Sequence, residues 1–331
     1  MKNHINQIYS RRIDIDTIKA FGIFFVVLGH INSPASQFIF SWHMPFFFFI
    51  SGFFIDKHLP LSLSLKKYFQ RLMIPYFFFG IIGIVAEILK RNMLQRGAIN
   101  IWDSLIGLFF WMDISSLNHY GFVLWFLPSL LWGKICITCF VKYMKNYYLV
   151  LLIIISMVYI VFYSRVIYPF ALDTAMISTF WIFLGYIYFN YFLDKKLKYL
   201  YMFLIIILLT ISYMTFPPVL NIANKSFSYP IWNYIFSSIT VIILANAIMN
   251  LPIFHQLSII NFWGKNTLWV LFLHPYTNNI AHIIVKKFSY DSMWYIKLLC
   301  SLLMIHILLH VKIWISLKFN FTQNLLKKHS E

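Results

Sequence analysis

Ionisable side chains inside apolar stretches are the residues of this sequence whose types and spacing could do chemistry. Asp16 and Lys19 are three residues apart at the start of a long apolar run, and His30 lies near its end. On a helix, Asp16 and Lys19 can pair, while Lys19 and His30 lie within about 20° of one face and about 16 Å apart along the axis. Ionisable groups in a membrane helix are expensive, so they are functional candidates by default. The structural alternative is a lysine that snorkels to the membrane surface and a histidine satisfied within the core.

A second histidine, His43, opens the next apolar run. A short hairpin between the two runs would bring His43 to the depth of His30, where the two histidines could share a polar cavity. Pro45 and Gly52 in the same run permit a local helix break and a close approach between helices.

Basic residues gather again before the third apolar run, at Lys66, Lys67 and Arg71. They are either charges that keep this loop in the cytoplasm or a patch that binds the phosphates of a nucleotide-bearing cosubstrate. His306 and His310 are four residues apart and could share a metal, but that helix offers no third ligand. We therefore expect no metal site.

The elements that carry these residues are membrane helices. The chain has 331 residues, of which 61% are hydrophobic and only 11% charged, unlike a soluble domain. We predict an all-α, polytopic integral membrane bundle that forms a single domain over residues 1–331. Stretches of membrane-spanning length predict about ten transmembrane helices, near residues 17–34, 38–56, 72–90, 121–142, 147–164, 174–193, 198–217, 230–250, 264–285 and 294–317. The stretch 91–120 is predicted to be a loop with an interfacial or re-entrant piece.

The formal net charge of +17 would suggest nucleic acid in a soluble protein. Here the basic residues fall mainly between apolar stretches, so we expect a lipid bilayer as the surroundings and no nucleic-acid partner. Roughly twice as many basic residues lie on one side of the predicted spans as on the other, which places both termini in the cytoplasm.

Six blocks of the sequence bear on the identity of the bundle. In chain order they are Asp16-x-x-Lys19-x10-His30, His43-Met44-Pro45-Phe46-Phe47-Phe48-Phe49-Ile50-Ser51-Gly52, Arg71-Leu72-x-Ile74-Pro75-Tyr76, Leu124-Trp125-Phe126-Leu127-Pro128, Gly185-Tyr186 and Gly264-Lys265-Asn266-Thr267-Leu268 through His274. Together they resemble the membrane-bound acyltransferase 3 family, and within it the fucose 4-O-acetylase-like branch that modifies surface polysaccharides.

This resemblance implies an O-acetyltransferase in the bacterial cytoplasmic (inner) membrane. The enzyme would move an acetyl group from acetyl-CoA to a hydroxyl of a cell-surface or lipid-linked sugar, as in lipopolysaccharide O-antigen, capsule or exopolysaccharide. His30 matches the essential histidine of the family. Two positions depart from the family pattern: Lys19 stands where an arginine is usual, and Tyr68 replaces the first arginine of the R-x-x-R that ends at Arg71.

The mechanism that follows is a hypothesis. A neutral imidazole is a suitable base near pH 7, so His30 would deprotonate the acceptor hydroxyl, either directly or by way of an acyl-histidine. The supporting residues would be Asp16 to hold Lys19, then Lys19, Lys67 and Arg71 to bind the phosphates of acetyl-CoA, and His43 and Trp125 to bind the sugar. Two alternatives remain open: a transferase for succinyl or another acyl group, and a transporter or flippase for lipid-linked sugars.

Overall fold

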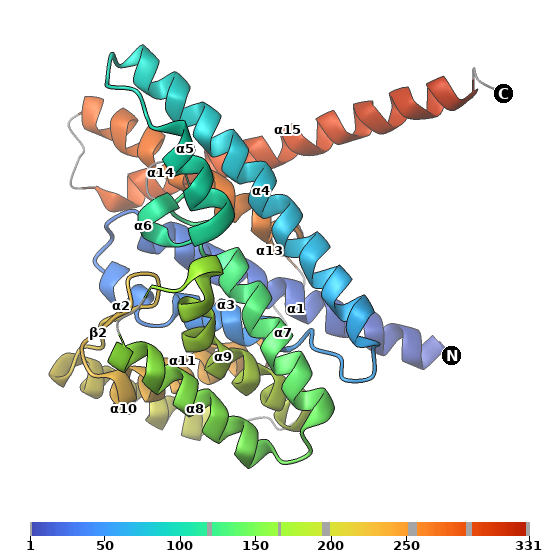
Figure 1. The fold of residues 1–331 in the computed structure, drawn as a ribbon, viewed down its shortest axis with the longest axis vertical. Helices are drawn as coiled ribbons and strands as arrows, with labels where there is room; N and C mark the ends of the chain where they lie inside the picture. The colour runs from blue at the N-terminus through green and yellow to red at the C-terminus, as the bar shows by residue number, and fades with distance from the viewer. Residues whose placement is uncertain are drawn as a thin grey trace. The chain divides into compact units, whose positions relative to one another are not determined.

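The computed structural model describes residues 2–117, 121–164, 167–193, 199–250, 257–288 and 293–328, and most of them are helical (Figure 1). Contacts group the chain into two compact units. The first unit joins the two ends of the chain, residues 1–39 and 252–331, and the second holds residues 40–251. The blue N-terminal helix and the orange and red C-terminal helices of Figure 1 therefore belong to one unit.

The first unit is built on its first helix. Its helices are α1 (Lys2–Gly29), α13 (Ser258–Lys265), α14 (Thr267–Lys287) and α15 (Trp294–Lys328). The short α2 (Ser36–Phe40) belongs to it up to Ile39, where the chain passes to the second unit. α1 packs mainly against α13 and also against α14, and α15 packs along α14. At Gly264, a Cβ atom would lie 1.9 Å from the carbonyl oxygen of Asp16. Only glycine permits this approach of α13 to α1.

The second unit is centred on α9. Its helices are α3 (His43–Gly52), α4 (Leu61–Met93), α5 (Ile101–Ile106), the π-helix η1 (Gly107–Trp111), α6 (Ile114–Leu117), α7 (Phe126–Tyr143), α8 (Tyr147–Ser164), η2 (Pro169–Ala171), α9 (Leu172–Ile187), η3 (Tyr188–Phe192), α10 (Tyr199–Thr215) and α11 (Pro230–Asn250). α3 and α7 both pack on α9. A Cβ at Gly185 would lie 1.9 Å from the oxygen of Phe49, and one at Gly52 would lie 2.2 Å from the oxygen of Ile182. Small residues therefore let α3 and α9 pack backbone to backbone, as membrane helices do.

A small antiparallel hairpin completes the second unit. Its strands are β1 (Leu220–Asn221) and β2 (Ser226–Phe227). Lys225, in the hairpin, donates a hydrogen bond of 2.6 Å to Asp173 in the first turn of α9. Because the Asp173 carboxylate is only 1% exposed, this ion pair supplies the counter-charge that burial requires.

Five described helices are long and apolar enough to cross a membrane, fewer than the ten predicted. They are Leu61–Met93, Phe126–Tyr143, Pro169–Phe192, Pro230–Asn250 and Trp294–Lys318. The apolar helices Tyr147–Phe162 and Leu200–Thr215 are shorter, and the predicted span 38–56 contains only the ten residues of α3 because a turn at Ser41–Trp42 precedes it. The membrane orientation of the termini stays a prediction.

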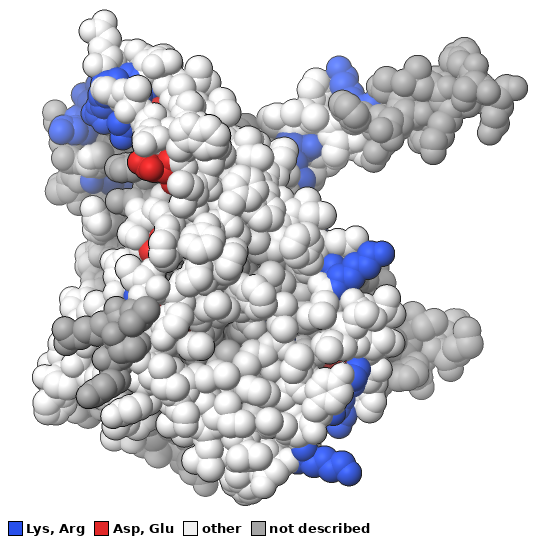
Figure 2. Space-filling model, in the orientation of Figure 1, with Lys and Arg blue, Asp and Glu red and all other residues white. Residues whose placement is uncertain are grey.

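Two of the spanning helices expose most of their apolar surface. In α15 only 17% of the apolar window is buried, and in α4 only 33%. Figure 2 likewise shows a face on which uncharged residues predominate and charged residues are confined to a few clusters. Such a surface suits contact with lipid chains, which cannot hydrate charged groups.

Candidate functional site

His30 lies at the point where α1 ends. The helix stops at Gly29, and Asn32 follows with a φ of 58°, in the left-handed region that asparagine tolerates at helix ends. His30 is half-buried. Its backbone N–H still donates to the oxygen of Val26 at 3.2 Å, so the last turn of α1 fixes the position of this residue.

The ring of His30 lies against the ring of His274, which comes from α14. The ring centroids are 5.2 Å apart and the planes are tilted by 40°. His274 is fully buried, so His30 is the more accessible member of the pair. The two imidazoles therefore form a ring pair in which one member is half-buried and the other is fully buried.

A proline fixes the proton position on His274. Pro275 lies inside α14 and has no N–H, so the carbonyl of Leu271 lacks its usual helical donor. The Nδ1 atom of His274 lies 2.8 Å from that oxygen. Since a carbonyl oxygen only accepts, Nδ1 must carry the proton, and in the neutral ring Nε2 is then the acceptor.

A polar network connects the three helices around the histidine pair. Asn278 donates to the oxygen of Val27 at 3.3 Å, near the end of α1, where the carbonyls of a helix lack intrahelical donors. Ser301 of α15 donates to the Oδ1 of Asn278 at 2.6 Å, and its hydroxyl lies 2.9 Å from that of Thr277. These bonds hold α1, α14 and α15 in register and so fix the two rings.

Asp16 and Lys19 lie further back along α1. Lys19 donates to Asp16 at 2.6 Å, and both side chains are partly exposed. The Asp16 backbone is held by the close approach of Gly264. The ammonium of Lys19 is therefore anchored by Asp16.

Lys67 and Arg71 lie one turn apart on α4 in the second unit, and both are exposed. Tyr68, between them, is buried, and its hydroxyl lies 3.1 Å from that of Thr138 on α7. This contact fixes the face of α4 from which the two cations extend. The arrangement suits an anionic group at the surface of α4.

Lys134 of α7 is a further functional candidate, which was not predicted from the sequence. It is only 7% exposed, and its ammonium lies 3.3 Å from the oxygen of Ser51 and 4.5 Å from the centre of the Tyr68 ring. The available signal was a lysine in the middle of the predicted span 121–142, whose other lysine, Lys142, lies at its end.

His43 and Trp125 also lie in the second unit. His43 is buried at the start of α3, with its ring 5.4 Å from that of Phe40. Trp125 is 6% exposed and packs against Phe48 and Phe126. The predicted sugar contacts of His43 and Trp125 stay predictions, as does the predicted cavity shared by His30 and His43.

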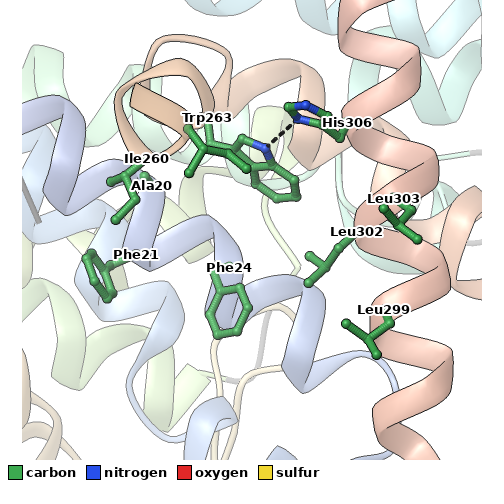
Figure 3. Close-up of a pocket in the computed structure, with 10 residues that line it drawn as sticks. Ala20, Phe21, Phe24, Ile260, Trp263, Leu299, Leu302, Leu303 and His306 are labelled. Carbon is green, nitrogen blue, oxygen red and sulfur yellow. Dashed lines mark hydrogen bonds between the residues drawn. The ribbon is translucent and has the colours of Figure 1, made fainter. Parts of the chain in front are cut away.

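A cavity of about 390 Å³ in the first unit lies between α1, α13 and α15 (Figure 3). Its lining residues are Ala20, Phe21, Phe24, Ile259, Ile260, Trp263, Leu299, Leu302, Leu303 and His306. The indole N–H of Trp263 is already used, because it donates to Nδ1 of His306 at 3.4 Å (Figure 3). These apolar walls do not suit a phosphate or a sugar hydroxyl. Within the described residues, no group of three metal-ligating side chains comes together.

Comparison with known proteins gives one result. Neither the search of curated proteins nor the search of solved structures found a significant match. The family model Acyl_transf_3, described as an acyltransferase domain, matches residues 12–311, which include the histidine pair, the Asp16–Lys19 pair and the cations of α4. With its apolar spanning helices, the chain is thus a membrane acyltransferase that belongs to the acyltransferase 3 family.

Proposed function

We propose that this chain is an O-acetyltransferase that moves an acetyl group from acetyl-CoA to a hydroxyl of a cell-surface or lipid-linked sugar, with His30 as the general base. The contact between His30 and His274 carries the proposal. A neutral imidazole is the side chain best suited to take a proton near pH 7. We place the chain in the fucose 4-O-acetylase-like branch of the family and in a bacterial inner membrane.

In the proposed reaction, the oxygen of the sugar hydroxyl attacks the thioester carbonyl of acetyl-CoA while His30 takes the proton of that hydroxyl. The new C–O bond forms and the C–S bond breaks. The departing thiolate of CoA then takes the proton from His30, which returns the base to its neutral form. His274 is a positioning residue: its Nδ1 is bound to the Leu271 oxygen, which fixes the ring beside His30.

The donor would be held by its phosphates. Lys19, oriented by Asp16, and the exposed Lys67 and Arg71 are the proposed phosphate-binding residues. Lysine binds phosphate as a point charge, whereas arginine can bind it through two parallel hydrogen bonds. His43 is proposed to orient the acceptor. Trp125, which has the same exposed fraction of 6% as His43, is proposed to contact the sugar as well.

The test is an acyl-transfer assay in membranes that carry the wild-type chain. Acetyl-CoA labelled in the acetyl group is incubated with the host's surface glycan, and label is followed into alkali-labile ester. The proposal expects labelled ester. Ester that forms from succinyl-CoA and not from acetyl-CoA would show that the transferred group is succinyl. Ester from neither donor would contradict the proposal.

A further inference from the structure

Lys134 is a buried cation that the proposed reaction does not yet use. It lies near the middle of α7, one of the helices apolar enough to cross a membrane, and is 7% exposed. A charged side chain at that position is expensive unless a partner compensates it. An ionisable group kept inside a spanning helix therefore calls for a partner of opposite charge.

The described part of the chain supplies little compensation. The ion pairs found there involve Asp16, Glu87 and Asp173, and none includes Lys134. Its hydrogen bond to the oxygen of Ser51 is long, at 3.3 Å. The rings of Tyr68 and Phe54, with centroids 4.5 Å and 5.7 Å from the ammonium, add cation–π attraction but no negative charge.

Further positive charges lie close to this ammonium. The ammonium contacts the ring of Tyr68, which lies on α4 next to Lys67 and three residues before Arg71. None of the three cations forms an ion pair with a carboxylate among the described residues, so an anion that binds among them would relieve their mutual repulsion. The flexible four-carbon stem of lysine lets the ammonium turn towards such an anion.

We propose that Lys134, with Lys67 and Arg71, forms a binding site for a phosphate group of the acyl donor. The proposal rests on the proposed function, because CoA is the donor whose phosphates the site would take. Lys134 supplies the buried charge, and Lys67 and Arg71 supply the exposed charges through which the phosphate enters. Tyr68 is a positioning residue, because its ring and its bond to Thr138 hold α4 against α7.

The test compares the binding of CoA and of pantetheine, which lacks the phosphates and the nucleotide, to the purified full-length protein. Lys134→Met removes the charge. Lys134→Gln also removes the charge but keeps an N–H donor for Ser51, in case the methionine variant does not fold. The matched control is Lys142→Met, since Lys142 lies on the same helix and also donates to a backbone oxygen, that of Leu59, at 2.7 Å.

We expect Kd for CoA to rise roughly 10- to 100-fold in either neutral variant, from the loss of a charge-assisted hydrogen bond. Kd for pantetheine should not change, and Lys142→Met should bind both ligands as the wild type does. Equal weakening of both ligands, or an unchanged Kd for CoA, would overturn the phosphate site while leaving the proposed function intact. A wild-type protein that does not bind CoA would instead contradict the proposed function.

Discussion

Replacing Gly264 with alanine tests whether α13 must lie directly on α1. The added Cβ would be 1.9 Å from the Asp16 oxygen and 2.5 Å from its carbonyl carbon. To reach an ordinary contact of 3.4 Å, the two helices must separate by about 1.5 Å. Both neighbouring atoms are backbone, so no side-chain rotation can relieve the clash. We expect a loss of roughly 1–3 kcal/mol in the free energy of unfolding, as for other overpacked sites.

The assay is reversible unfolding of purified protein, followed by tryptophan fluorescence. Gly97→Ala is the matched control, because no atom lies within 4 Å of the position of its Cβ. The same displacement moves Asp16, which anchors Lys19, so Gly264→Ala should also weaken CoA binding if Lys19 binds a phosphate. A Gly264→Ala protein as stable as Gly97→Ala would refute the close packing of α1 and α13.

Two further substitutions probe other parts of the structure. Lys225→Met leaves the buried Asp173 carboxylate without its cation, so we expect a loss of roughly 3–5 kcal/mol in the free energy of unfolding. Adding Asp173→Asn should recover part of that loss. A double variant that is no more stable than Lys225→Met would contradict the role of the ion pair. His274→Phe keeps a ring beside His30 but removes the hydrogen bond to the oxygen of Leu271. We expect kcat for acyl transfer to fall by up to about 100-fold, with little change in KM for acetyl-CoA. An unchanged kcat would refute the positioning role of His274.

The sequence predicted the membrane class and the approximate position of several helices. The predicted span 230–250 coincides with α11, and 294–317 lies within α15. The number of spans was not predicted correctly, since hydropathy does not show where a helix is interrupted. The run 38–56 is mostly apolar, but the turn at Ser41–Trp42 leaves only the short α3.

The candidate site was predictable only where its residues are close in sequence. The spacing of Asp16 and Lys19 is enough to indicate their pairing. The partner of His30 is more than 240 residues away in the chain, at His274, and no local pattern gives such a contact. The His274-Pro275 pair could have indicated a histidine that satisfies a carbonyl left open by proline. Lys134 was missed because one cation hardly changes the hydropathy of a long apolar segment.

The proposed role of His30 as the base of an acyl transfer can be tested by substitution. The most direct measurement follows radiolabelled acetyl-CoA into alkali-labile ester of the host's surface glycan, in membranes that carry equal amounts of wild type, His30→Ala or His282→Ala. His282 is the matched control because it is an exposed histidine on α14. We predict that wild type and His282→Ala form labelled ester, and that His30→Ala slows its formation by roughly 10²- to 10⁴-fold. A His30→Ala protein that transfers acetyl at the rate of His282→Ala would contradict the account.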